Sequence, residues 1–150
     1  MSDSLAFCLS DVSRLFRKRF DSAARDIGIT GPQWRVLFVV RHSPGINQGQ
    51  LADQMDVEPI TTCRMIDRME AASLIERRRD PGDRRAWQLF LTPDAMALIG
   101  QAEVVANSIA GTATVGLDAA DQAQLVVLLA RLRDNLLDDT RFETREKQVG

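Results

Sequence analysis

The residues of this sequence that could do chemistry are mainly arginines, spaced as nucleic-acid recognition would require. Thr61 and Arg64 lie three residues apart and Arg68 follows about one turn later, so a helix here would carry them on one side. Arginine donates two hydrogen bonds to guanine O6 and N7, and threonine offers a hydroxyl and a methyl group to base edges. Together with the apolar Ile60, these side chains suit a helix that enters the major groove of DNA.

A second basic cluster follows a turn signal. The Asp-Pro-Gly-Asp sequence of residues 80–83 separates two strand-like runs, 75–79 and 85–91, so Arg84 and Arg85 would lie at the tip of a β-hairpin. An arginine there suits the minor groove, whose negative potential is enhanced where the groove is narrow. Asp83 cannot itself favour DNA, and we expect it to hold an arginine in place by a salt bridge.

The arginines of the first strand-like run, residues 77–79, alternate in direction, so we expect at least one of them to approach DNA. The predicted DNA-contacting residues are Ile60, Thr61, Arg64, Arg68, Arg78, Asp83, Arg84 and Arg85.

Residue types that catalysis or metal binding would need are scarce. The chain has one histidine, His42, and no tyrosine, and its two cysteines, Cys8 and Cys63, lie outside any CxxC spacing. These residues offer few candidates for a general acid–base pair, a zinc site or a disulfide framework. We therefore expect a protein that is not an enzyme, with no catalytic residues, metal or cofactor; Cys63 is expected to pack in a helix and His42 to lie solvated in a loop.

Charge is distributed unevenly along the chain, although the net charge is only −2. Residues 14–41 are strongly basic and residues 57–92 slightly basic, whereas residues 93–139 are acidic. DNA affinity depends on local positive charge that faces the phosphates, and it does not require a positive net charge of the whole protein. This distribution favours DNA binding by the first half of the chain and keeps the second half away from the duplex.

Hydrophobic spacing predicts the long helices. Apolar residues recur at steps of three and four over residues 4–27, over 93–113, and in a last helix that begins after Asp118. These stripes exceed what one small lobe can cover, so we expect them to pack against a second copy of the chain.

Shorter helices and a hairpin lie between the long ones. Thr30 with Gln33, and Asn47 with Gln50, have the spacing of capping boxes, and Pro59 stands where a further helix would begin. A short helix, a tight turn, a second helix and a hairpin are typical of a winged helix-turn-helix. The predicted fold is mainly α with a small β-wing.

The sequence shows no stretch of about 18 apolar residues, as a transmembrane helix would need. It also begins without the basic and apolar regions of a secretory signal. We therefore expect a cytoplasmic location.

Several of these segments together resemble the MarR/SlyA family of regulators. The resemblance rests on residues 50–52 (QLA), 61–70 (TTCRMIDRME), 74–75 (LI), 83–86 (DRRA) and 91–92 (LT). It covers nearly the whole chain and implies an obligate homodimer of winged-helix subunits on a palindromic DNA site, controlled by a small ligand or by thiol oxidation. By position, Thr61 and Arg64 resemble groove-reading residues and Arg85 resembles the minor-groove arginine. Ser73 stands where glycine is usual, so we expect some strain in that turn.

The resemblance also implies a domain plan. We expect one domain over residues 1–150, in which 4–28 and 93–139 form the dimerisation helices, 30–92 the DNA-binding lobe and 140–150 a flexible tail. In SlyA-like members, positions that match Arg14 and Arg17 meet carboxylate ligands, and an aromatic residue that matches Trp34 borders the pocket. A flat apolar slot with a guanidinium suits an aromatic acid. The predicted ligand-binding residues are Arg14, Arg17, Trp34 and Phe38.

The main interpretation is a sequence-specific transcriptional regulator that represses from an inverted-repeat operator and is released by a small aromatic acid. One alternative is a regulator that senses oxidants through Cys8, although the chain has no tyrosine to assist that thiol. Another alternative is a winged helix that binds proteins instead of DNA, which would favour apolar side chains at the hairpin tip.

Overall fold

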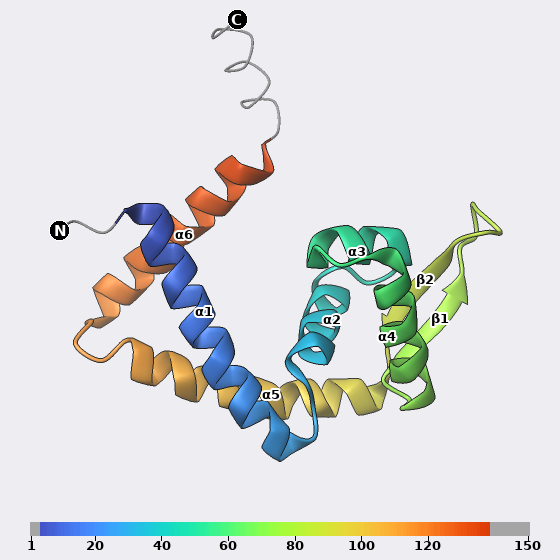
Figure 1. The fold of residues 1–150 in the computed structure, drawn as a ribbon, viewed down its shortest axis with the longest axis horizontal. Helices are drawn as coiled ribbons and strands as arrows, with labels where there is room; N and C mark the ends of the chain where they lie inside the picture. Colours follow the sequence, from blue (N-terminus) through green and yellow to red (C-terminus); the bar gives the residue numbers. More distant parts are fainter. Residues whose placement is uncertain (1–3, 139–150) are drawn as a thin grey trace, which may run out of the picture. The chain divides into compact units, whose positions relative to one another are not determined.

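The computed structural model describes residues 4–138, which are mostly helical and contain one antiparallel hairpin (Figure 1). The helices are α1 (Leu5–Ala24), α2 (Gly31–His42), α3 (Gln48–Met55), α4 (Pro59–Ala71), α5 (Pro93–Ala113) and α6 (Ala119–Leu137). The strands are β1 (Ile75–Arg79) and β2 (Trp87–Leu91). The predicted class, mainly α with a small β-wing, is confirmed.

The chain divides into two compact units, one up to Ala110 and the other from Gly111. The predicted tail, residues 140–150, lies outside the described residues. Within residues 4–138 there is no helix with the length and hydropathy that a bilayer crossing needs.

The first unit has a single apolar core to which every element from α1 to α5 contributes. Burying each of its larger aliphatic side chains stabilises the fold by about 1.5–3 kcal/mol. Each helix from α1 to α5 and strand β2 contributes at least one large side chain to this core, for example Phe20, Leu37, Leu51, Ile66, Ile99 and Leu89.

Local sequence signals set the ends of the helices in this unit. Thr30 and Asn47 form the two predicted capping boxes, since each side chain accepts from the third backbone N–H of its helix while Gln33 and Gln50 reach back. The first helix differs from the prediction over 4–27, because the α-helix ends at Ala24 and residues 25–27 form a 3₁₀ turn.

The hairpin pairs Ile75 with Leu91 at its base and Arg79 with Trp87 toward its tip. The sequence predicted that the second strand would begin at Arg85, but residues 84 and 85 lie in the turn and pairing starts at Trp87. On its other edge β2 is held by the connection between α2 and α3, where Leu89 exchanges backbone hydrogen bonds of 2.9 and 3.0 Å with Gly45 and Ile46. The middle of β2 is therefore held by backbone hydrogen bonds along both of its edges.

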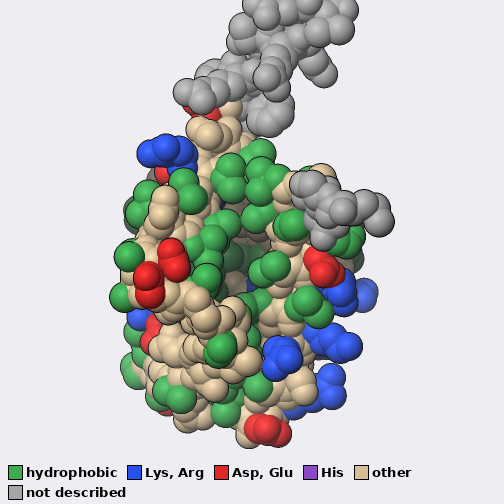
Figure 2. Space-filling view, turned by 90° about the vertical axis from the view of Figure 1, so that its left-hand side faces the viewer, with side chains coloured by type: hydrophobic (Ala, Val, Ile, Leu, Met, Phe, Trp, Pro, Cys, Tyr) green, Lys and Arg blue, Asp and Glu red, His purple; other side chains and the backbone are tan. Residues whose placement is uncertain are grey.

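The second unit begins with the last turn of α5 and contains α6. Gly116, at φ +89°, makes the turn between these helices, and Asp118 caps α6 in a capping box with Asp121. Four leucines of α6 are between 42 and 66 % exposed in the single chain: Leu125, Leu128, Leu129 and Leu136. Hydrophobic side chains also cover much of the face shown in Figure 2.

Candidate nucleic-acid interface

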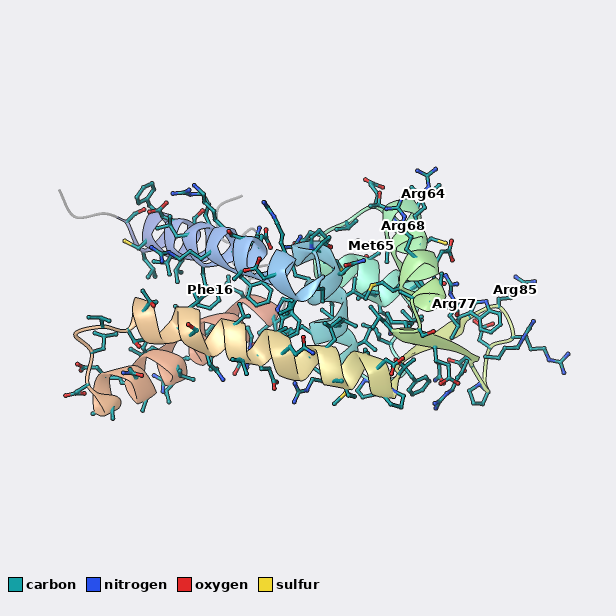
Figure 3. All side chains as sticks on the ribbon, turned by 90° about the horizontal axis from the view of Figure 1, so that it is seen from below. Phe16, Arg64, Met65, Arg68, Arg77 and Arg85 are labelled. Carbon is teal, nitrogen blue, oxygen red and sulfur yellow. The ribbon has the colours of Figure 1, made fainter. Side chains whose placement is uncertain are left out.

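Helix α4 separates its buried and exposed sides as a groove-reading helix must. Thr62, Ile66 and Met69 are fully buried against the core, which fixes the helix in place. Thr61, Arg64 and Arg68 are exposed, as is Ile60 at 64 %. In Figure 3 the Arg64 side chain extends away from the body of the first unit. The four predicted α4 residues thus share one exposed side.

The turn of the hairpin is organised by two aspartates. Asp80 Oδ1 accepts hydrogen bonds from the backbone N–H of Gly82 at 2.7 Å and of Asp83 at 3.3 Å. Asp83 Oδ1 accepts from the backbone N–H of Arg85 at 2.9 Å. The expected salt bridge from Asp83 to an arginine is absent from residues 4–138, because this short carboxylate bonds the backbone of its own turn instead.

Arg84 and Arg85 are exposed at the hairpin turn, and their guanidinium groups make no ion pair within the described part of the chain. Figure 3 shows Arg85 at the outer end of the hairpin. A free guanidinium on a projecting turn is available to phosphate or to the floor of a minor groove.

The three arginines of β1 are engaged within the protein. Arg78 bonds Glu76 at 3.1 and 3.2 Å and lies over the Phe90 ring at 4.2 Å. Arg79 lies over the Trp87 ring at 4.9 Å. The hydrogen bond and charge of Arg78 hold the pKa of the Glu76 carboxyl below its ordinary value. A DNA contact by Arg78, which stays a prediction, would have to compete with these partners.

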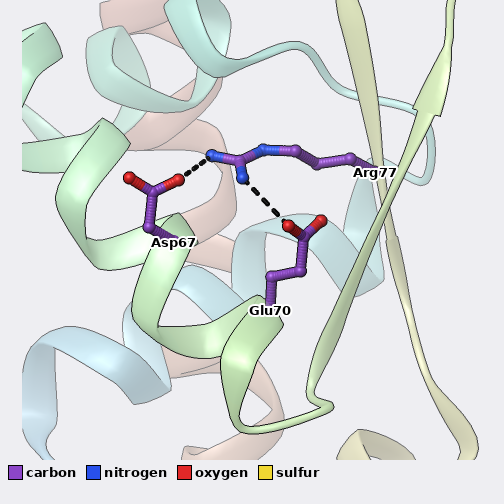
Figure 4. A network of polar contacts seen from close by, with 3 residues as sticks. All are labelled: Asp67, Glu70 and Arg77. Carbon is purple, nitrogen blue, oxygen red and sulfur yellow. Dashed lines mark hydrogen bonds and ion pairs between the residues drawn. The ribbon is translucent and has the colours of Figure 1, made fainter.

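Arg77 reaches from β1 to α4 (Figure 4). One guanidinium nitrogen lies 2.6 Å from Asp67 Oδ1 and the other 3.2 Å from Glu70 Oε1. Its side chain is only 15 % exposed. Burial lowers the pKa of Arg77, but the hydrogen bonds and charges of Asp67 and Glu70 outweigh burial and leave it above its ordinary value.

Sequence reasoning missed this contact between the hairpin and α4. The spacing of Asp67 and Glu70 places both carboxylates on one side of α4, which was the available signal. It did not show which arginine would meet them.

The four predicted ligand-binding residues lie in two places. Arg14 and Arg17 line an open depression along α1, where Arg14 also pairs with Asp11 at 2.7 Å. Trp34 and Phe38 do not line this depression. The Trp34 ring is partly buried, 5.3 Å from the ring of Phe20, whereas Phe38 is 49 % exposed.

His42 and the cysteines lie at the surface. His42 is the last residue of α2, not a loop residue as predicted, and its Nδ1 lies 2.8 Å from the Phe38 carbonyl oxygen. Both cysteines are free and exposed, so the prediction that Cys63 is a helix-packing residue is wrong. Within residues 4–138 there is no cluster of three or more residues that could hold a metal ion.

Comparison with known proteins identifies this arrangement. The family model described as MarR family matches residues 29–87, which include α2, α3, α4, β1 and the hairpin turn up to the first residue of β2. The crystal structure of the transcriptional regulator PA3341 is 32 % identical and superposes with a TM-score of 0.75, over 90 % of this chain and 99 % of that one.

Two further relatives have similar folds. The MarR protein of E. coli is 24 % identical, with a TM-score of 0.78 over 88 % of this chain and 98 % of that one. A mutant of it, solved in complex with operator DNA, is 25 % identical with a TM-score of 0.69, over 85 and 92 %. A MarR family protein of Mycobacterium tuberculosis, RV2887, solved in complex with salicylic acid, is 24 % identical with a TM-score of 0.72, over 87 and 97 %.

The exposed polar side of α4, the basic hairpin turn and these similarities agree with one another. Proteins of this family regulate transcription and are not enzymes, and this chain belongs to the MarR family of winged-helix DNA-binding regulators.

Proposed function

We propose that this chain is a homodimeric repressor that binds an inverted-repeat operator and leaves it when a small aromatic acid binds. The proposal rests on two features: the exposed, hydrogen-bonding side of α4, and Arg84 and Arg85 on the adjacent hairpin, which make no ion pair within residues 4–138. Two copies would place two α4 helices in successive major grooves, about 34–36 Å apart. Arg85 of each hairpin would then enter the flanking minor groove.

Specificity and general affinity would come from different side chains. Thr61 and Arg64 would read base edges, whereas Arg84 and Arg85 would release counterions from the phosphates or the groove beside them. The E. coli relative solved with operator DNA supports this use of the fold.

The test begins with fragments of genomic DNA that the purified chain selects, followed by affinity measurements at several salt concentrations. Arg64→Ala should weaken binding about tenfold or more and relax the base preference, because a bidentate contact is lost. Arg85→Ala should weaken binding and give a shallower salt dependence. Arg133→Ala, which removes an exposed arginine from α6, serves as the control for lost charge. Unchanged affinity in both Arg64→Ala and Arg85→Ala would overturn the proposal.

Dimerisation is proposed from the apolar surface that the single chain leaves exposed. Leu5, Leu9 and Val12 on α1 are 38 to 63 % exposed, and the leucines of α6 are exposed to a similar extent. A second copy packed on these side chains by two-fold symmetry would cover them. A monomer by sedimentation at micromolar concentration would contradict this part of the proposal.

Ligand control is proposed from Arg14, Arg17, Trp34 and Phe38, together with the relative solved with salicylic acid. A ligand releases the protein only if it binds the DNA-free form more tightly, and tenfold release needs a tenfold difference in affinity. Salicylate is the probe. It should weaken operator binding of the native chain and have less effect on Arg17→Ala. No effect of salicylate or related aromatic acids on the native complex would remove this part of the proposal.

A further inference from the structure

The two groups of predicted DNA contacts lie on different elements, so contacts between the hairpin and α4 must fix their relative position. Arg64 belongs to a helix packed on the core, whereas Arg85 belongs to the turn of a two-stranded hairpin. A two-stranded hairpin is at best marginally stable alone, and its outer end departs from its anchored base. Small changes in its direction would therefore move Arg85 relative to Arg64.

At its base the hairpin is tied to neighbouring segments by backbone hydrogen bonds. Leu74 donates to Met69 at 2.9 Å, and Thr92 donates to Leu74 at 3.2 Å. These bonds hold the strand ends next to α4 but lie away from the turn that carries Arg85. Leu89, which pairs with Arg77, also exchanges backbone hydrogen bonds with Gly45 and Ile46. The backbone hydrogen bonds of residues 80–86 run within the hairpin, so the direction of its outer part depends on side chains as well.

Among the arginines of β1, Arg77 has the geometry to fix that direction. Its two nitrogens bond carboxylates three residues apart on α4, at 2.6 and 3.2 Å. Two bonds from one planar group to two separate acceptors constrain orientation as well as distance. The Arg77 side chain is 15 % exposed, whereas Asp67 and Glu70 are 59 and 44 % exposed, so the value of the two bonds lies in the direction they impose on Arg77 more than in their strength.

The neighbouring arginines act within the hairpin. Arg78 bonds Glu76 and lies over Phe90, and Arg79 lies over Trp87, so each stiffens the two strands without reaching α4. Arg77 is thus the β1 arginine that links the hairpin to the helix.

We propose that Arg77 is a positioning residue for DNA binding, which holds the hairpin at the angle to α4 at which Arg64 and Arg85 reach adjacent grooves together. The inference rests on the proposed function of operator binding. It adds that the contribution of Arg85 depends on Arg77, although Arg77 itself touches no DNA.

The test is a double-mutant cycle of operator affinity. Arg85→Ala should weaken the native chain about tenfold. In an Arg77→Met background, which keeps the length of the side chain and removes both bonds, Arg85→Ala should weaken binding by less than about threefold. Arg64→Ala should cost the same factor in both backgrounds, because α4 is held by its buried side. We call the factor by which Arg85→Ala weakens operator binding the Arg85 factor. If Arg77 served folding alone, Arg77→Met would lower stability and leave the Arg85 factor unchanged.

A matched control removes another arginine that joins two elements of the same unit. Arg41 of α2 pairs with Glu103 of α5, so Arg41→Met loses the same charge and an ion pair between elements away from the hairpin. The Arg85 factor should stay near tenfold in that background. Arg77→Lys retains the charge but loses the planar guanidinium that bonds both carboxylates, so the Arg85 factor in that background should lie between the native and the Arg77→Met values.

A variant on the helix side covers the case in which Arg77→Met fails to fold. Asp67→Asn with Glu70→Gln removes both ion pairs while Arg77 stays, and its loss of negative charge should by itself favour DNA binding. We expect the Arg85 factor to fall in this variant as well. An Arg85 factor of the same size in every background would overturn the inference, whereas a native chain that binds no selected fragment would overturn the proposed function itself.

Discussion

At the scale of single residues, Gly31 is the position where one added carbon should disturb the first unit. Gly31 is buried at the start of α2, and a Cβ there would overlap the carboxylate of Asp21 from α1. Asp21 Oδ1 is buried and has no hydrogen-bond partner within residues 4–138, so the substitution forces this carboxylate to turn aside, and the cost is that of repacking it. Gly31→Ala should lower the free energy of unfolding by about 1–3 kcal/mol, measured by urea denaturation, although alanine is the better helix former.

The control for Gly31→Ala is Gly100→Ala. Gly100 is exposed within α5, and a Cβ there would meet no atom within 4 Å. That substitution should raise stability by up to about 1 kcal/mol through helix propensity alone. Combining Gly31→Ala with Asp21→Ala should restore part of the lost stability. A Gly31→Ala variant as stable as the native chain would contradict the packing argument.

Single residues could be predicted from the sequence where their partners are close along the chain. The caps at Thr30 and Asn47 were predictable because helix geometry fixes an interval of three residues. The contact of Arg77 with α4 was not predictable. Strand alternation sends neighbouring side chains to opposite faces of the hairpin but does not show which face lies against α4. Asp83 was mispredicted because its turn offered a nearer donor, the N–H of Arg85, than any guanidinium.

At the scale of elements, the turn from α4 into β1 stores strain at Ser73. Ser73 has φ +59°, in the left-handed region that favours glycine, as its place in the sequence suggested. Its carbonyl accepts a hydrogen bond of 2.5 Å from the Thr92 hydroxyl, which helps to keep this conformation. Ser73→Gly should raise the free energy of unfolding by about 1 kcal/mol, measured by thermal or urea denaturation, because the cost of a side chain in this region is removed.

Ala71→Gly gives the matched comparison for that turn. Ala71 is the last residue of α4 and is exposed, so glycine there relieves no strain. It should lower stability by about 0.5–1 kcal/mol through backbone entropy. If Ser73→Gly and Ala71→Gly changed stability in the same direction and by the same amount, the strain at Ser73 would not be real.

The elements themselves were largely predictable, because stripes and caps act over one or two turns. α2, α5 and the start of α6 fall where capping residues and proline placed them. The start of β2 was less predictable. Arg85 and Trp87 both suit a strand, and the turn bonds of Asp80 and Asp83 decide where pairing begins.

At the scale of the whole molecule, the sequence indicates a second copy more clearly than it indicates the surface where the copies meet. Apolar stripes longer than one small core can cover are visible in α1 and α6. Which residues of each stripe meet the second copy depends on contacts between chains. Exposure in the single chain narrows the choice, because Phe20 is buried in the first unit whereas Leu5 and Val12 are not.

The proposed dimer predicts that one charge on the apolar side of α6 separates the subunits. Leu128 is 46 % exposed on the same side as Leu125 and Leu129. Leu128→Lys should place a charge in the interface and shift the chain from dimer to monomer at micromolar concentration, measured by sedimentation. Operator affinity should fall at least tenfold, because a monomer reaches one half-site only and loses the gain from joint binding.

The control is Ala123→Lys, which adds the same charge to an exposed position on the opposite side of α6, by the helical angle of about 100° per residue. Ala123→Lys should remain a dimer and bind the operator with native affinity or slightly better. Equal dissociation by both substitutions would place the interface elsewhere. A Leu128→Lys chain that is monomeric yet binds the operator at full strength would show that the recognition helices do not need to be paired.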